Sequence, residues 1–115
     1  MSVTDWSEVP GEDLTDKIHR RYVNGCNMTV TKFIFKKGAV AASHSHVYEQ
    51  VMLVESGLIE LTLPSGRVRL GEGQVLIIPP YVEHSAIVLE DTVDYDVFSP
   101  VRLDWLEGKD QYLRG

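Results

Sequence analysis

The sequence has very little cysteine, no excess of positive charge and no long apolar run. Cys26 is the single cysteine among 115 residues, so no disulfide framework is expected and a reducing cytoplasm is the predicted setting. The net charge of −6 argues against nucleic acid or an anionic membrane as a partner, because both need basic patches. The longest apolar run, residues 75–82, is too short to span a bilayer and contains two prolines. The N-terminus has an acidic residue where a signal peptide needs a cation.

Long helical periodicity is also missing, and short alternating segments take its place. Segments rich in Val, Ile, Thr and aromatic residues recur about every 8–12 residues between Gly and Pro turns, which indicates an all-β sandwich or barrel. The expected strands are 17–23, 27–35, 48–54, 58–63, 67–70, 75–78, 84–89 and 93–98, with a helical turn over 104–108. We expect one domain, with a polar arm over 1–16. The arm and an outer strand make up residues 1–25, the β-barrel 26–99 and a C-terminal tail 100–115.

The segment 38–57 carries the strongest chemical signal. His44 and His46 are two residues apart, a spacing that puts both imidazoles on one face of a strand, about 6.5–7 Å apart. Gln50 shares that face by parity, whereas Glu49 faces away and would need a bulge to reach inward. Two imidazoles and an amide oxygen therefore make up most of a metal site. Since amides are poor ligands and Glu49 is adjacent, Glu49 stays open as an alternative to Gln50.

Two gapped patterns in the chain resemble the two motifs of the cupin family. The first is Gly38-x5-His44-x-His46-x3-Gln50-x6-Gly57, and the second is Gly73-x5-Pro79-x4-His84. The 15 residues between them match the short spacer of small single-domain cupins. The resemblance covers residues 28–98 and implies a single-domain jelly-roll β-barrel with one divalent metal ion, held by His44, His46, Gln50 and His84. Nickel or zinc is favoured, and histidine-rich sites also accept iron, manganese, cobalt or copper.

The chain departs from the usual cupin patterns at three positions. Tyr81 stands where the second motif usually has Gly, and Val88 stands where it usually has Asn. Gln50 stands where the first motif usually has Glu. With neutral ligands only, a bound metal keeps its full +2 charge and is harder to oxidise. The glutamine therefore favours polarisation of a substrate oxygen over O₂ activation.

A second constellation follows in the last expected strand. Asp96 and Phe98 share a strand face with Asp94, and Arg102 lies beyond the end of that strand, where it could fold over the barrel mouth. Taken singly, each residue also fits a structural role: a solvated Asp96, a core Phe98, and Arg102 in a surface pair with Asp104.

Together with the histidine motifs, however, the stretch Asp-x-Phe-x-x-x-Arg resembles the pectin-degradation cupins of the KdgF type. Those cupins linearise 4,5-unsaturated uronates released by pectate and alginate lyases. The resemblance implies catalytic roles for Asp96 and Arg102 and substrate binding by Phe98, Arg102 and Tyr48. Asp96 would move a proton to the ring carbon and activate water, and Arg102 would hold the carboxylate of an anionic sugar acid.

Two other functions remain open on the sequence. One is a cupin dioxygenase that uses iron or copper, which would take up O₂. The other is a non-enzymatic cupin that binds a sugar or another small ligand, without any dependence on Asp96. Small cupins generally pair through outer sheet faces, and the segment 17–35 is apolar enough to cross to a partner, so a homodimer is expected.

Overall fold

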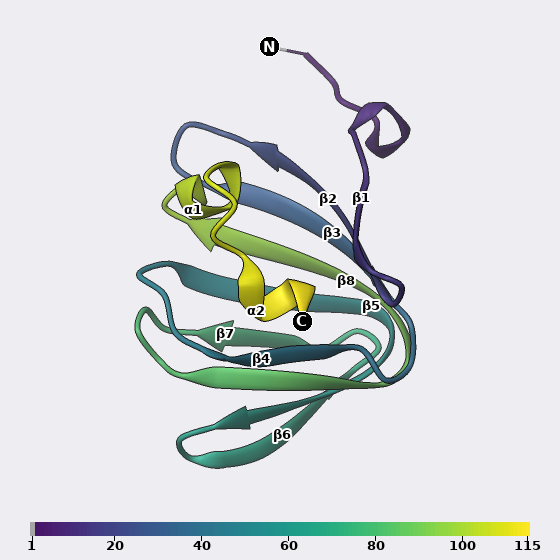
Figure 1. Cartoon of the computed structure of the whole chain (residues 1–115), viewed down its shortest axis with the longest axis vertical. Helices are drawn as coiled ribbons and strands as arrows, with labels where there is room; N and C mark the ends of the chain where they lie inside the picture. The colour runs from purple at the N-terminus through teal and green to yellow at the C-terminus, as the bar shows by residue number, and fades with distance from the viewer. Residues whose placement is uncertain (1) are drawn as a thin grey trace.

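The computed structural model describes residues 2–115, and most of its elements are β-strands (Figure 1). The strands are β1 (Glu12–Thr15), β2 (Ile18–Asn24), β3 (Thr29–Phe35), β4 (Val40–His44), β5 (Glu49–Leu63), β6 (Gly66–Gly71), β7 (Val75–Ile78) and β8 (His84–Ser99). A 3-10 helix η1 (Trp6–Glu8) precedes them, and two short helices follow, α1 (Leu103–Leu106) and α2 (Gln111–Arg114). The expected all-β fold class is confirmed.

The long strands β5 and β8 organise the other strands. The strand order is β1-β2-β3-β8-β5-β6, with β4 added on β8 and β7 on β5, and the pairs are antiparallel. The second half of β8 pairs with β3, whereas its first half pairs with β4, and β5 pairs with both halves. The sheet therefore folds over on itself as a jelly roll that is not strictly closed (Figure 1).

Two turn signals in the sequence mark bends and not strand ends. The segments 48–54 and 58–63 form the single strand β5, and 84–89 and 93–98 form β8. Register shifts against β8 occur between Val54 and Ile59, where the strand turns from one layer to the other. Gly57 at this bend has φ +103°, and a Cβ there would lie 2.6 Å from the Cα of Thr92. Glycine is needed because the two long strands cross closely at this point.

The two ends of the chain contain more structure than their sequences suggest. Residues 12–15, which we expected to lie in a polar arm, form β1 and pair with β2. Leu14 is buried and gives this short strand an apolar anchor. At the other end, α1 occupies the expected helical turn, and α2 is a further helix whose Leu113 is also buried. Figure 1 shows α2 beside the barrel, where it contacts β4 and β1.

Alternate residues of the strands fill the interior. Most of them are apolar and form one continuous core that includes Ile18, Phe33, Met52, Val54, Ile59, Leu61, Leu70, Ile78, Val88 and Phe98. Gln50, His84, Asp94 and Asp96 are buried on the same inward faces. Polar groups inside an apolar core are costly unless they are paired or used. Their grouping identifies the part of the interior where a functional site is expected.

Candidate metal centre

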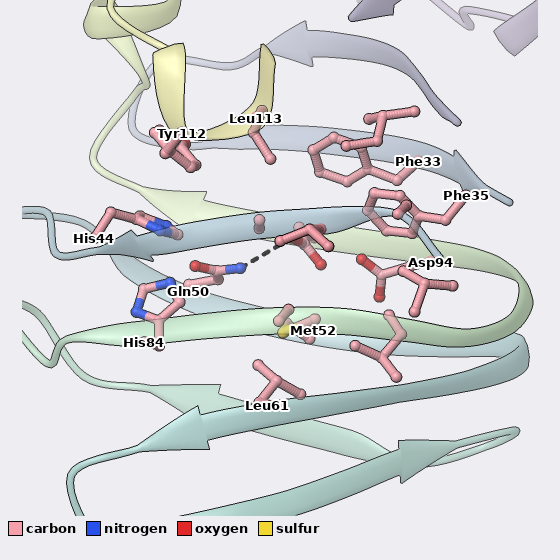
Figure 2. A pocket seen from close by; sticks show the side chains of 18 of the residues that line it. Phe33, Phe35, His44, Gln50, Met52, Leu61, His84, Asp94, Tyr112 and Leu113 are labelled. Carbon is pink, nitrogen blue, oxygen red and sulfur yellow. Dashed lines mark hydrogen bonds between the residues drawn. The ribbon is translucent and has the colours of Figure 1, made fainter. Parts of the chain in front are cut away.

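A cavity of about 50 Å³ lies inside the jelly roll, and its polar lining residues come from β4, β5 and β8. Figure 2 shows His44 and His84 at one end of this cavity and Asp94 toward the other, with Gln50 between them. Asp96 also lines it, and the remaining wall is mainly apolar. The cavity therefore has a histidine end and a carboxyl end.

Three histidines converge at the first of these ends. One potential ligand atom from each of His44, His46 and His84 lies within 4.8 Å of the other two. His44 ends β4 and pairs with His84, the first residue of β8. The expectation that His46 shares a strand with His44 is wrong: His46 lies in the connection between β4 and β5. The imidazoles still meet because this connection folds inward, with the rings of His44 and His46 5.5 Å apart.

Each of the three imidazoles is oriented by a backbone carbonyl. The Nδ1 atoms of His44, His46 and His84 lie 2.6, 3.0 and 2.8 Å from the carbonyl oxygens of residues 42, 48 and 82. A ring that donates its Nδ1–H to a carbonyl keeps a free lone pair on Nε2, which is the usual arrangement in a metal-bound histidine. The Nε2 atom of His84 is buried and has no hydrogen-bond partner. A metal ion would be a suitable partner for the lone pair of this nitrogen.

The histidines are held in the neutral form that a metal requires. Burial lowers the pKa of His44 and of His46 to about 4, with neighbouring positive and imidazole groups adding to the effect. Burial likewise lowers the pKa of His84. Neutral imidazole is the form that binds metal, so no proton competes for these nitrogens at neutral pH.

Gln50 joins the histidine end to the carboxyl end. Its side chain is buried, whereas Glu49 is exposed, so Gln50 is the residue of this pair that faces inward. Its Oε1 lies 3.1 Å from Nε2 of His46, and its Nε2 donates to Oδ2 of Asp96 over 3.0 Å. Atoms this close together could both contact one metal ion, since bonds from zinc to nitrogen and oxygen are about 2.0–2.2 Å long. The spacing of Gln50 and His46 fits that arrangement.

Two carboxyl groups occupy the other end of the cavity. Asp94 and Asp96 are almost completely buried, and both oxygens of Asp94 and Oδ1 of Asp96 have no hydrogen-bond partner. Burial raises the pKa of Asp94 well above its ordinary value, and the adjacent Asp96 raises it further. Burial also raises the pKa of Asp96, against the opposing effect of the hydrogen bond from Gln50 and of the positive charge of Arg102. At least one proton therefore belongs to this pair near neutral pH.

The other residues singled out in the sequence lie around Arg102. The guanidinium is buried, and its Nε and one Nη donate to the two carboxylate oxygens of Asp104 over 2.9 and 2.7 Å. It lies over the rings of Tyr48, Phe98 and Trp105, 4.4–4.6 Å from their centres. Phe98 lines the cavity, whereas Arg102 and Tyr48 are not among its lining residues. Substrate binding by Arg102 and Tyr48 stays a prediction.

Sequence reasoning missed one residue beside the histidines. The ring of Tyr112 in α2 stacks on His44, with ring centres 3.8 Å apart and planes 20° from parallel. Its hydroxyl oxygen accepts hydrogen bonds from Arg102 and Trp105. No spacing rule links residue 112 to the motifs, and the only signal is an aromatic residue in an otherwise polar tail.

The residues that depart from the usual cupin motifs, Tyr81 and Val88, do not disturb the arrangement of the histidines. Tyr81 has φ +66°, the left-handed conformation that favours glycine, and its N–H donates to the carbonyl of His46 over 2.8 Å. The turn that holds His46 is thus formed without a glycine. Val88 is buried among apolar side chains of the core.

Comparison with known proteins identifies the family of the chain. The Cupin domain family matches residues 31–98, and the chain belongs to that family. Among curated proteins, no sequence matches the chain. Within residues 2–115, there is no helix with the length and apolarity needed to cross a membrane.

Solved structures give a finer comparison. The chain is similar to KdgF from Halomonas sp., with 29% identity, a TM-score of 0.82, and coverage of 90% of this chain and 99% of that one. It is also similar to an RmlC-like cupin from Shewanella frigidimarina, with 26% identity, a TM-score of 0.82, and coverage of 89% and 93%. Oxalate decarboxylase from Bacillus subtilis, described with Mn(II) centres, shares the fold at 21% identity and a TM-score of 0.74, with coverage of 87% of this chain and 30% of that one.

Proposed function

We propose that this cupin is a metal-dependent enzyme that opens the ring of 4,5-unsaturated uronate monosaccharides. The observation that carries the proposal is the Gln50 carboxamide, whose oxygen faces His46 while its N–H groups hold Asp96. This one side chain lies between a three-histidine cluster, of which His44 and His84 line the cavity, and a buried carboxyl group of the same cavity. The similarity to KdgF from Halomonas sp. supports the same reaction.

The proposed metal ligands are His44, His46, Gln50 and His84. The unsatisfied Nε2 of His84 and the carbonyl-anchored Nδ1 atoms support this set. When bound, a divalent metal supplies polarisation of a substrate oxygen without changing its oxidation state. Nickel or zinc suits four neutral ligands of this kind, and the other first-row divalent metals follow availability.

The reaction assigns Asp96 to proton transfer. The Asp94–Asp96 pair holds a proton, and Asp96, which is bonded to Gln50, would donate it to C4 of the C4=C5 bond. As the C4–H bond forms, a water oxygen bonds to C5 and returns its proton to Asp96. The resulting hemiketal breaks its bond between C5 and the ring oxygen, which gives a 5-ketone and a hydrate at C1. Loss of water from that hydrate yields the open-chain aldehyde, so the net change is an isomerisation.

The residues of the cavity wall suit a sugar ring that carries a carboxylate on one edge. Phe98 and Met52 offer apolar faces on which a planar unsaturated ring can pack. Contact between Arg102 and the substrate carboxylate requires a guanidinium nitrogen that is not paired with Asp104, and the second Nη is the one without a partner. If Arg102 makes this contact, Arg102→Ala should raise KM by the equivalent of about 1.5–3 kcal/mol, and Arg102→Lys should not restore it.

The direct experiment uses the metal-loaded protein and a lyase digest of pectin or alginate. Loss of the ultraviolet absorbance of the conjugated alkene should follow protein addition, and a chelator should stop it. Mass spectrometry should show a product of the same mass as the substrate, as an isomerisation requires. An unchanged alkene absorbance with protein loaded separately with nickel, zinc, iron, manganese and cobalt would reject the proposal.

We further propose that the protein is a homodimer. The outer face of β5 and β7 exposes Leu53, Val75 and Ile77, and Leu53 pairs across the strands with Val75. An apolar sheet face of this kind suits a second copy of the chain. Light scattering at micromolar concentration should give twice the mass of the 13.0 kDa chain, and a monomer would refute the proposal.

We also propose a reducing compartment, the cytoplasm, as the place of action. Cys26 is exposed and unpaired, as suits a reducing environment. Fractionation of the source cells with an antibody should find the protein with cytoplasmic markers, and recovery from an oxidising compartment would contradict the proposal.

A further inference from the structure

The cavity is too small for the substrate it is proposed to bind. Its volume is about 50 Å³, whereas pockets for small organic ligands occupy about 300–1,000 Å³. Tyr112 and Leu113 of α2 form part of its wall (Figure 2), next to Trp105 of α1. The conformation is therefore a closed one. Residues 110–115, which lie beside the histidines, are the part of the wall that could move to open it.

The segment 110–115 is attached to the barrel through side chains. Among residues 2–115, no backbone hydrogen bond joins this segment to a strand, and its own Leu113 N–H bonds to the Asp110 carbonyl. Moving it would leave every strand pairing intact. Local openings of low free energy occur in segments with this kind of attachment.

A set of ion pairs fixes α2 in the closed position. Asp110 is fully buried, and its carboxylate contacts Arg20 of β2 at 3.0 Å and Arg114 at 2.7 Å. Arg114 also lies 3.5 Å from Glu12 of β1. These contacts join α2 to the first two strands, while Leu113 adds one buried apolar side chain.

A separate anchor holds the preceding helix. Trp105 of α1 is buried, with the guanidinium groups of Arg20 and Arg102 4.3 and 4.4 Å from its ring centre. Between the two helices, Gly108 has φ +73° and nothing within 4 Å of the position of a Cβ. The chain therefore has a fixed part, α1, and an unobstructed glycine before α2, which suits a hinge.

We propose that residues 110–115 form a gate over the histidine end of the cavity, with Tyr112 as its closing residue. In the closed state Tyr112 stacks on His44 and lines the cavity beside His84, which is buried. Rotation about Gly108 removes the ring, exposes His84 and enlarges the cavity for a small-molecule substrate. The stacking on His44 also makes the gate responsive to what the histidines bind.

The test follows the chemical modification of His84 by diethyl pyrocarbonate in the metal-free protein, read by peptide mass spectrometry. The Nε2 of His84 is buried and unpartnered in the closed state, so it reacts only after opening. His19 lies outside the cavity and serves as the internal reference. Because neither metal nor substrate is used, the outcome does not depend on the proposed reaction.

Three variants separate the gate from a general loss of structure. Tyr112→Ala should raise the His84 rate about tenfold or more, since burial and stacking of the ring both favour closure. Arg114→Gln should raise it about two- to fivefold, because it removes partly exposed ion pairs. Lys109→Gln removes only an exposed pair with Glu107 in the same segment and should leave the rate unchanged.

Measurement in low urea distinguishes gate opening from unfolding. Opening of six residues exposes little surface, so the His84 rate should depend weakly on urea. A rate that rises as steeply as global unfolding would overturn the gate. Equal His84 rates in the wild type and in all three variants would overturn it, as would a wild-type His84 rate equal to that of His19.

Discussion

The two ends of the cavity satisfy their polar atoms in opposite ways. At the histidine end, each imidazole has its Nδ1 on a backbone carbonyl and leaves Nε2 available for a metal. At the carboxyl end, three oxygens of Asp94 and Asp96 have no protein donor at all. The histidine end has nitrogen lone pairs that a cation could bind, and the carboxyl end has oxygens that a proton could bind.

The difference shows what each end contributes to a reaction. Burial lowers the pKa of the histidines and raises the pKa of the carboxyl groups, so the histidine end is neutral at neutral pH and the carboxyl end holds a proton. A metal restores positive charge at one end, and a transferable proton is held at the other. Gln50, a neutral amide, connects them without adding a third acid to the Asp94–Asp96 pair.

The largest effect should follow removal of the transferable proton. Asp96→Ala should lower turnover by about 10²–10⁴-fold while metal affinity is retained, because the carboxyl group acts in proton transfer and is not a ligand. Kinetics on an unsaturated monouronate, with metal content measured in parallel, would check this. Glu90→Ala, an exposed carboxylate of the same strand, is the matched control and should retain activity. Near-normal turnover of Asp96→Ala would show that another group moves the proton.

A smaller effect on turnover should follow a change of Gln50, which connects the two ends of the cavity. Gln50→Glu offers an anionic ligand, so metal binding should be equal or tighter, but Asp96 loses its N–H donor and gains a neighbouring acid. Turnover should fall by about 10–100-fold, as for other groups that support a metal site. Gln50→Ala should instead weaken both metal binding and turnover. Full activity of Gln50→Glu would mean that the amide has no special part in the site.

The sequence predicted the histidine end better than the carboxyl end. The spacing of His44, His46 and His84 resembles a known pattern, and their convergence follows even though His46 lies outside the strand. Strand alternation correctly placed Asp94 and Asp96 on one face. It did not predict that their oxygens would lack hydrogen-bond donors. That absence depends on which side chains of β3 and β5 face them, which a local pattern does not contain.

Other features depended on contacts between distant parts of the chain. Arg102 was expected either over the barrel mouth or in a surface pair with Asp104; it does pair with Asp104, but it is buried because Tyr48, far away in the sequence, packs on it. Tyr112 meets His44 only because α2 folds back onto β4. The bends of β5 and β8 resembled strand ends, since glycine and acidic residues mark both kinds of position.

The histidine end should destabilise the metal-free fold in acid. The pKa of His44 and of His46 is about 4 in the folded state and about 6.5 when unfolded, so the unfolded state binds more protons between these values. Stability should therefore fall as pH drops from about 6.5 toward 4, by up to about 1.4 kcal/mol per pH unit per histidine. Urea unfolding of chelator-treated protein measures this slope. His46→Gln should make the slope shallower than in the wild type, and equal slopes in the two proteins would contradict the account.

The carboxyl end should act in the opposite sense, and Asp94→Asn should reveal it. The folded-state pKa of Asp94 is raised, so its contribution to stability is present below its unfolded pKa and is lost as pH rises through the folded value. Asparagine is nearly isosteric and brings its own N–H donor for the unpartnered Oδ1 of Asp96. Because folding of the wild type at pH 7 requires Asp94 to take up a proton, and asparagine does not, the variant should be more stable than the wild type by about 1 kcal/mol or more, since each unit of pKa shift corresponds to about 1.4 kcal/mol.

That advantage should shrink as the pH falls toward 4, because Asp94 then increasingly carries its proton in the unfolded wild type as well. The acid slope of Asp94→Asn should consequently be steeper than that of the wild type, because the histidines then act without the opposing carboxyl group. Urea unfolding of the metal-free proteins at pH 7, 5.5 and 4 gives both slopes. Asp91→Asn, an exposed acid of the same strand, is the control and should leave the slope unchanged. A lower stability of Asp94→Asn at pH 7 would mean that Asp94 is ionised in the folded protein and that an unseen cation, and not a proton, completes this end of the cavity.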